Sequence, residues 1–218
     1  MRPRRTFDII FSLLFLIPTL VLVLAMALLM CWDSQGCPIF WQRRVGKNSK
    51  SFWMLKIRTM RKNLDSKGDG IEDIAVNLDD PRITPAGRFL RRYHLDELPQ
   101  ILNILLGDMS LLGPRPMTEK IVEARTKLTP RYEERHTIRP GLFGLAQLKG
   151  TEIRLPNRHL DQLALDLFYI QNQCFELDWQ IALATIKLIV FGKTPRLAFV
   201  SHELAEPRMK PEPMQEAA

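Results

Sequence analysis

The N-terminal part of the chain contains a long run of apolar residues. No charged residue occurs from Ile9 to Trp32, and only Ser12, Pro18 and Thr19 interrupt the run. A helix needs about 20 such residues to cross a bilayer, so the run predicts a membrane segment. A cleaved signal peptide fits less well, because the run is longer than the usual signal hydrophobic region and no small-residue cleavage site follows it.

The flanks of this run and its proline predict how it enters the membrane. Both flanks are basic, with Arg2, Arg4 and Arg5 before the run and Arg43, Arg44, Lys47 and Lys50 after it. Positive flanks prefer the cytoplasm, so a simple span would place one cluster on the wrong side. Pro18 interrupts the helical hydrogen-bond ladder and leaves arms of roughly 14 and 21 Å, each shorter than a hydrocarbon core of about 30 Å. We therefore expect a re-entrant helix hairpin over residues 1–36, and a kinked spanning helix is the alternative.

Beyond residue 36 the pattern changes to that of one compact, mainly helical α/β domain over residues 37–203. A short strand is expected from Phe52 to Arg58, and a polar loop over residues 63–80. Helices are expected at residues 85–93, 98–106, 117–136, 160–170 and 179–190. The last two are amphipathic, and both a place on the bilayer surface and ordinary core packing are open to them. The proline-containing tail, residues 204–218, is expected to be disordered.

Composition and charge narrow the classes of function. A chain of 218 residues has room for one domain plus a membrane segment. The net charge of +7 favours anionic partners such as lipid headgroups, nucleotides or nucleic acid. No recognition-helix motif or aromatic-basic sheet pattern occurs, so we expect no nucleic-acid partner. The three cysteines lack CxxC spacing, which argues against a disulfide scaffold or a structural zinc site. Whether the chain forms a homo-oligomer stays open.

An adjacent pair of acids, Asp96 and Glu97, is the strongest candidate for chemistry. Basic residues and loop glycines surround it in the sequence, namely Arg82, Arg88, Arg91, Arg92, the stretch Gly113-Pro114-Arg115-Pro116 and the stretch Arg139-Pro140-Gly141. This combination suits a phosphate substrate. A divalent cation held partly by substrate oxygens would remove the repulsion between a carboxylate and a diphosphate, and Asp96 could then attack phosphorus. The plain alternative is that Asp96 only caps the following helix.

Ordered sequence blocks along the chain carry a family resemblance. They are Arg4–Asp8, Pro38–Gln42, Arg44–Gly46, Lys56–Met60, Arg82–Arg88, Leu95–Gln100, Gly107–Ser110, Gly113–Pro116 and Arg139–Gln147. In these blocks the chain resembles the bacterial sugar transferase family, and within it the small monotopic phosphoglycosyl transferases. These enzymes act on polyprenyl phosphate in the first membrane step of glycan assembly, in pathways such as those of exopolysaccharide and lipopolysaccharide.

The resemblance implies a reaction and roles for individual residues. The donor would be a nucleotide-diphosphate sugar, with UDP as the expected nucleotide, and the acceptor polyprenyl phosphate, usually undecaprenyl phosphate. Asp96 would be the covalent nucleophile and a ligand of Mg2+, and Glu97 its partner in metal binding or proton handling. The expected phosphate-binding residues are Arg91, Arg115, Arg88, Lys56 and Arg58. The expected donor-binding residues are Arg139, Pro140, Gly141 and Gln147.

The resemblance also implies a location, and it leaves two departures. It places the catalytic domain on the cytoplasmic face of the bacterial inner membrane, in contact with membrane lipid, and supports the monotopic hairpin. Near the break the family often has Ser-Pro, whereas this chain has Ile17-Pro18. Where many members have Gly-Arg-Asn, this chain has Gly150, Thr151 and Glu152, so its donor-contacting loop departs from the family pattern. Direct transfer, with Asp96 only a metal ligand or base, and a membrane-anchored binding or scaffold protein remain as alternatives.

Overall fold

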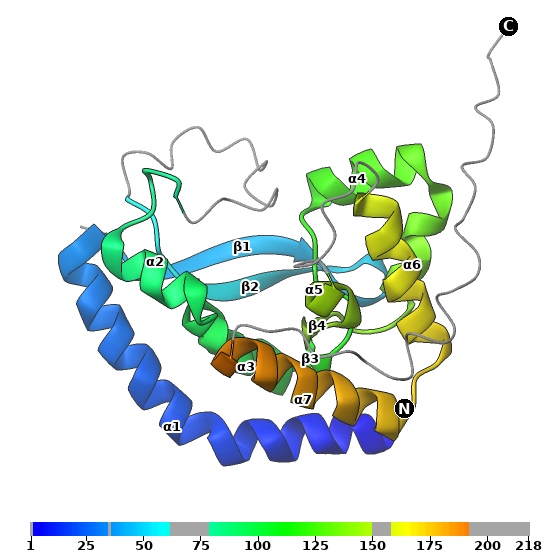
Figure 1. Ribbon diagram of the computed structural model, residues 1–218, viewed down its shortest axis with the longest axis horizontal. Helices are drawn as coiled ribbons and strands as arrows, with labels where there is room; N and C mark the ends of the chain where they lie inside the picture. Colours follow the sequence, from blue (N-terminus) through cyan, green and yellow to red (C-terminus); the bar gives the residue numbers. More distant parts are fainter. Residues whose placement is uncertain (1, 35, 62–78, 150–157, 192–218) are drawn as a thin grey trace, which may run out of the picture.

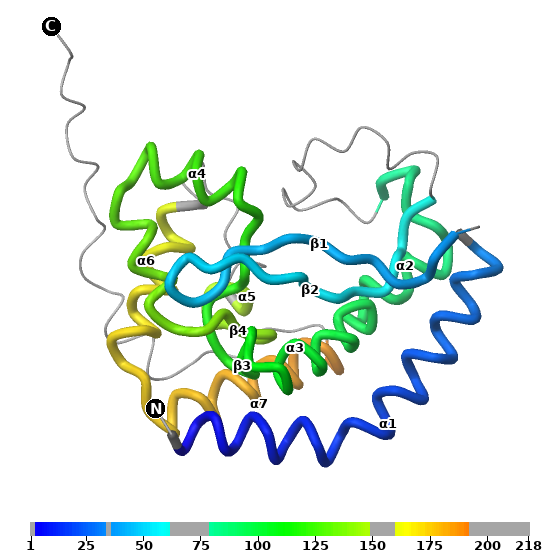
Figure 2. The backbone as a smooth tube through the Cα atoms, turned by 180° about the vertical axis from the view of Figure 1, so that it is seen from behind, coloured from blue at the N-terminus to red at the C-terminus, as the bar shows by residue number. Residues whose placement is uncertain are grey.

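A long N-terminal helix lies along one side of the molecule in the structure, a computed structural model that describes residues 2–34, 36–61, 79–149 and 158–191. This helix, α1 (Arg2–Ser34), is long and apolar enough to cross a membrane. It continues through Pro18, where a break was expected, and Figures 1 and 2 show it bent near its middle. A proline inside a helix removes one hydrogen bond and typically kinks it, which accounts for a bend without a break.

One face of α1 packs on the rest of the protein. Its buried residues recur at helical spacing, namely Asp8, Ser12, Thr19, Met26 and Met30. The opposite face exposes large apolar side chains, among them Ile10, Leu14, Ile17, Val21, Leu24 and Leu28. Contacts to the domain occur at both ends: Arg4 pairs with Asp178 at 2.9 Å, and Asp33 accepts a hydrogen bond from the backbone N–H of Ala86 at 3.1 Å.

Two small sheets lie in the middle of the domain. β1 (Ile39–Val45) and β2 (Ser51–Ile57) form an antiparallel hairpin that closes at the short helix η1 (Lys47–Ser49). β3 (Ser110–Leu112) and β4 (Gly141–Phe143) pair in parallel. The expected strand is thus confirmed as β2, and the described residues form a mainly helical protein with small sheets (Figure 1).

The remaining helices surround these sheets. They are α2 (Pro85–Arg92), η4 (Leu95–Gln100), α3 (Ile101–Leu106), α4 (Glu119–Leu128), η5 (Pro130–Thr137), α5 (Leu145–Lys149), α6 (Arg158–Gln171) and α7 (Phe175–Phe191). The expected helices at 85–93, 160–170 and 179–190 are confirmed as α2, α6 and α7. The loop residues 63–78, the departing residues Gly150, Thr151 and Glu152, and the tail 204–218 lie outside the described residues.

The prediction of a single helix over residues 117–136 is wrong, because the segment forms two helices, α4 and η5. Thr129 is extended, with φ −147° and ψ 97°, and Pro130 begins η5. A proline disfavours the helical conformation of the residue before it, which explains the separation. The separation turns η5 so that its Tyr132 packs with Leu163 and Leu167 of α6.

The core on either side of the hairpin determines where the acidic pair lies. Phe52 and Met54 of β2 pack with Ile104 of α3, and a separate cluster joins Ile57 of β2 to Met30 of α1. Because η4 continues directly into α3, this packing holds η4 against β2.

Candidate active site

The acidic pair lies inside η4, immediately after an unusual backbone turn. His94 precedes the helix in the left-handed conformation, with φ 55° and ψ 22°, and caps it without a side-chain hydrogen bond. Asp96 and Glu97 follow within the helix, and both are buried, with exposed fractions of 8% and 7%. The alternative that Asp96 acts as the helix cap is therefore wrong, because the cap position belongs to His94.

Glu97 is held by two cationic side chains from distant parts of the sequence. Arg115 reaches both carboxylate oxygens, with Nη2 2.5 Å from Oε1 and Nη1 3.3 Å from Oε2. The ammonium of Lys56, on β2, lies 3.4 Å from Oε1. Burial by itself would raise the pKa of Glu97, but the charges of Arg115 and Lys56 outweigh it and hold this pKa well below its ordinary value. Glu97 is therefore ionised at neutral pH.

Asp96 is in a different environment although it is the neighbouring residue. Among the residues that the structure describes, no hydrogen bond or ion pair reaches its carboxylate. Burial raises the pKa of Asp96, and the negative charge of Glu97 raises it further, while Lys56 and Arg91 act in the opposite direction. A buried carboxylate without a partner is available for chemistry, in contrast to one that already forms an ion pair.

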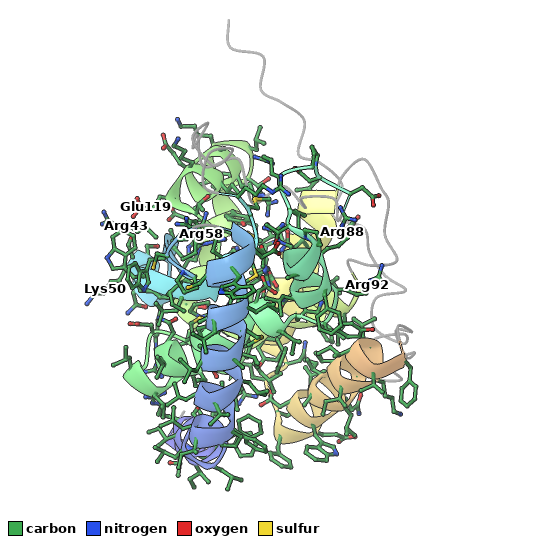
Figure 3. The ribbon with its side chains drawn as sticks, turned by 90° about the vertical axis from the view of Figure 1, so that its left-hand side faces the viewer. Arg43, Lys50, Arg58, Arg88, Arg92 and Glu119 are labelled. Carbon is green, nitrogen blue, oxygen red and sulfur yellow. The ribbon has the colours of Figure 1, made fainter. Side chains whose placement is uncertain are left out.

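The basic residues expected at the site fall into two groups. Lys56, Arg91 and Arg115 act electrostatically on Asp96, and Arg91 is held in place because its Nε donates to Thr59 Oγ1 at 2.7 Å. Arg58 lies immediately after the end of β2, two residues beyond Lys56. Its Nε and Nη1 atoms are buried and have no hydrogen-bond partner within the described part of the chain. Arg88 is exposed on α2, and Figure 3 shows it and Arg58 flanking the C-terminal end of α1.

The expected donor-binding residues lie in the scaffold behind Arg115. Arg139 donates from Nε to the backbone oxygen of Gly107, 2.7 Å away at the end of α3. The backbone oxygen of Pro140 accepts a bond from Ser110, and the side-chain amide of Gln147 donates to Leu142 at 3.4 Å.

Gly141 belongs to the same scaffold and approaches Gly113 closely. A Cβ atom at position 141 would lie 2.1 Å from the Gly113 nitrogen, so only glycine fits there. Arg139, Pro140, Gly141 and Gln147 thus lie around the β3–β4 junction and form no hydrogen bond with the acidic pair, and their role in donor binding stays a prediction.

Sequence reasoning did not select two residues that shape this site. Thr59, buried at 4% exposure, accepts the Arg91 hydrogen bond and so orients a phosphate-binding candidate. His94 is the second, because its left-handed backbone begins the turn that leads into the helix with the buried pair. Membership of the Lys56–Met60 block was the only sequence signal for Thr59.

The carboxylates present fit a magnesium ion that the substrate helps to hold. Among the described residues no group of three or more His, Cys, Asp or Glu side chains forms a complete metal site. Mg2+ is usually bound through one or two carboxylates together with substrate phosphates and waters. Asp96 has the unpaired oxygens for such a site, whereas both oxygens of Glu97 already contact Arg115.

Comparison with known proteins defines the class to which this site belongs. The family model described as bacterial sugar transferase matches residues 2–192. The chain therefore belongs to the bacterial sugar transferase family, as the resemblance predicted, and is a sugar-phosphate transferase enzyme.

Individual relatives are similar over most of the chain. The exopolysaccharide production protein PSS of Rhizobium leguminosarum bv. phaseoli is 39% identical over 188 residues, which cover 84% of this chain and 92% of the relative. UDP-glucose:undecaprenyl-phosphate glucose-1-phosphate transferase of Caulobacter vibrioides is 36% identical over 185 residues, 84% of this chain and 68% of the relative. Undecaprenyl-phosphate glucose phosphotransferase of Komagataeibacter xylinus is 35% identical over 198 residues, 88% of this chain but only 37% of that longer protein.

Proposed function

We propose that this protein transfers a sugar phosphate from a UDP-sugar to undecaprenyl phosphate, through a covalent intermediate on Asp96, as the first membrane step of exopolysaccharide assembly. Relatives named as undecaprenyl-phosphate glucose phosphotransferases and as exopolysaccharide production proteins support the reaction class. The observation that carries the mechanism is the buried Asp96 carboxylate, which has no hydrogen-bond or ion-pair partner among the described residues and lies beside Glu97, which is ionised and paired.

In the first step an oxygen of the Asp96 carboxylate attacks the phosphorus atom next to the sugar. The bond between this phosphorus and the bridging oxygen breaks. The nucleoside monophosphate leaves with the bridging oxygen and its electron pair. The sugar phosphate stays on Asp96 as an acyl phosphate.

In the second step a phosphate oxygen of undecaprenyl phosphate attacks the same phosphorus. The bond from this phosphorus to the Asp96 oxygen breaks, so the carboxylate is regenerated. The product is an undecaprenyl diphosphate sugar. When the acceptor enters as a dianion, the two steps together take up and release no net proton.

The charges at the site favour an anionic substrate. Lys56, Arg91 and Arg115 bring three positive charges near two carboxylates, and only one of them, Arg115, makes a two-point contact with Glu97. The unpartnered nitrogens of Arg58 offer further donors to phosphate oxygens. A bound Mg2+ would supply charge neutralisation between the Asp96 carboxylate and the diphosphate.

The arrangement of α1 supports a re-entrant, monotopic attachment to the inner membrane with the domain on the cytoplasmic side. Arg4 near one end and Asp33 near the other both bond to the same domain, so both ends of the helix stay on its side. A second apolar stripe lies on α7, whose N-terminal end meets that of α1 where Arg4 pairs with Asp178 (Figures 1 and 2). Its large exposed apolar residues are Phe175, Trp179, Leu183, Ile186, Val190 and Phe191, and they suit contact with the bilayer surface.

The central test compares Asp96→Asn with wild-type protein in membranes given radiolabelled UDP-sugars. We expect the variant to reach the membrane in normal amount and to lose at least about 1,000-fold in transfer to extractable lipid, because the nucleophile is removed. Wild-type protein should release nucleoside monophosphate without acceptor and carry a phospho-sugar on the peptide containing Asp96.

The matched control is Asp161→Asn on α6, a carboxylate outside this site, which should leave the rate unchanged. A near-normal rate for Asp96→Asn would show the covalent mechanism to be wrong. Release of nucleoside monophosphate only when acceptor is present would indicate direct transfer, with Asp96 as metal ligand or base.

A further inference from the structure

Hydrogen bonds to main-chain carbonyls hold in place the segment that carries Arg115, residues Pro114 to Met117. Pro114 and Pro116 have no N–H to donate, so the segment cannot secure itself through a regular ladder. Instead each of the four carbonyls from Pro114 to Met117 accepts one hydrogen bond of 2.9 Å. The donors are, in order, Gly141 N, Arg135 Nη2, Arg44 Nη1 and Val45 N.

Arg135 is the donor to the carbonyl of Arg115 itself, and its side chain is almost completely buried. Its Nη2 atom lies 2.7 Å from Oδ2 of Asp166 on α6 and 2.9 Å from the Arg115 oxygen, so one nitrogen joins both. Nη1 donates to the Tyr132 hydroxyl at 2.8 Å. The side chains of Arg135 and Asp166 are only 1% and 2% exposed.

Stability alone is a weak reason for such a pair. Burying two charges costs desolvation energy that their attraction only roughly offsets, and apolar replacements are often as stable. Unlike an apolar contact, the Arg135–Asp166 pair directs a guanidinium N–H at one particular carbonyl, that of Arg115. The side chain of Arg115 in turn donates hydrogen bonds to both carboxylate oxygens of Glu97.

We propose that Arg135, oriented by Asp166, is a positioning residue that sets the place of Arg115 and, through it, the geometry of the acidic pair. The proposal rests on the proposed function, because it assigns the pair's geometry to the transfer reaction. A two-point contact such as that of Arg115 with Glu97 depends on sub-ångström placement, and a shift of about 1 Å can cost about 100-fold in rate.

The first test replaces Arg135 by Lys. The lysine ammonium can satisfy Asp166 but cannot span Asp166, Arg115 and Tyr132 as the guanidinium fork does. We expect kcat/KM for transfer to fall about 10- to 100-fold while the protein stays folded. The loss should appear mainly in kcat, with KM changed little, because a displaced Arg115 disturbs the reacting geometry, whereas a general loss of folded protein would leave kcat per active molecule unchanged.

Arg125→Lys is the matched control. Arg125 also lies over the Tyr132 ring, at 5.5 Å against 4.9 Å for Arg135, but its hydrogen bonds go to Tyr132 and Gln162. It should keep transfer within about twofold, as expected for substitutions away from the reacting groups. An equal loss in Arg125→Lys and Arg135→Lys would overturn the proposal, because both would then act only through the packing of η5 on α6.

A double-mutant cycle separates positioning from a general structural role. In an Arg115→Lys background, Arg135→Lys should cause little further loss of rate, because Arg135 acts through a residue that is already altered. If Arg135→Lys lowered the rate by the same factor in the Arg115→Lys background as in the wild-type background, the proposal would be overturned.

A second cycle uses melting temperature in detergent and does not depend on catalysis. The double variant Arg135→Lys, Glu97→Gln should lower the melting temperature by less than the sum of the two single decreases. A decrease equal to that sum would count against the proposal. Failure of the proposed function is recognised separately, because wild-type protein would then transfer no sugar phosphate or Asp96→Asn would remain active.

Discussion

Asp96 and Glu97 are adjacent and equally buried, yet their carboxylates are in opposite electrostatic situations. Glu97 is fixed by Arg115 and Lys56, and its pKa lies below the ordinary value, whereas the pKa of the unpaired Asp96 lies above it. Pairs of acids whose environments separate their pKa values in this way are typical of sites where one group reacts and the other stays charged. This difference supports the proposal that Asp96 is the nucleophile.

Lys56→Met should shift the acidic limb of the pH dependence of transfer to higher pH. In the proposed mechanism Asp96 attacks as the carboxylate, so the rate should fall as the pH drops through the pKa of Asp96. The ammonium of Lys56 lowers that pKa, and its removal raises it. The pH–rate profile measures the shift, with Lys127→Met as control, because Lys127 is exposed on α4 and, within the described part of the chain, forms an ion pair only with Glu123. An unmoved limb in Lys56→Met would mean that another group titrates.

His136 predicts a pH dependence of stability that is separate from catalysis. Burial, reinforced by the charge of Arg135, lowers the pKa of His136 to about 4, and neither ring nitrogen has a partner among the described residues. The unfolded chain binds a proton at the ordinary value near 6.5. The contribution of His136 to folding is therefore complete above pH 6.5 and is lost as the pH falls toward 4.

The measurement is the melting temperature in detergent from pH 7.5 to 5 for wild type and His136→Leu. The variant lacks the titrating group, so its melting temperature should fall less steeply on acidification. Taking the difference between the two proteins removes the contribution of the carboxylates. Parallel curves would contradict the assignment to His136.

At the level of elements, α1 is long and apolar enough to cross a membrane and also belongs to the core of the domain. Asp8 is 4% exposed and accepts bonds from the backbone N–H of Leu111 at 3.0 Å and from the Ser110 hydroxyl at 2.8 Å. Arg5 donates to the backbone oxygen of Leu105 at 2.8 Å, near the end of α3. The polar first turns of α1 thus join the membrane segment directly to β3, which leads into the Arg115 segment.

Asp8→Ala should destabilise this junction by about 2 kcal/mol, since it leaves a buried N–H without an acceptor. For a chain of this size that corresponds to a fall of about 6 °C in melting temperature in detergent. Ile10→Ala, two positions away on the exposed face, is the control and should change the melting temperature little. Equal effects of the two substitutions would show that Asp8 does not anchor the helix.

The break at Pro130 illustrates how an element boundary has consequences at the site. The charged pattern of residues 117–136 gave no sign of two helices beyond the proline itself. The separate helix η5 brings Arg135 to the Arg115 carbonyl, 20 residues earlier in the chain. A continuous helix would have directed Arg135 elsewhere, so the proline contributes to the site without touching it.

At the scale of the whole molecule, the topology prediction can be tested with the native cysteines. Cys31, Cys37 and Cys174 are all exposed. In the re-entrant arrangement, single-cysteine variants that retain Cys37 or Cys174 should react with a membrane-impermeant maleimide in inside-out vesicles and not in intact spheroplasts. Reaction of Cys37 from outside, with Cys174 protected, would indicate a spanning α1.

The local features of this protein can be predicted from its amino-acid sequence. The apolar run, the strand β2, most helices and the family all follow from residues near one another in the chain, since periodicity, turn chemistry and short motifs act locally. The selection of Asp96 and Glu97 as the candidate reacting pair came from the same kind of local signal. The tertiary structure decided which cations meet which carboxylate. Lys56 reaches Glu97 across 41 residues, and Arg135 reaches Asp166 across 31, while Arg139 supports α3 instead of the acidic pair. Such partnerships depend on how packed elements bring distant segments together, and no local pattern encodes them.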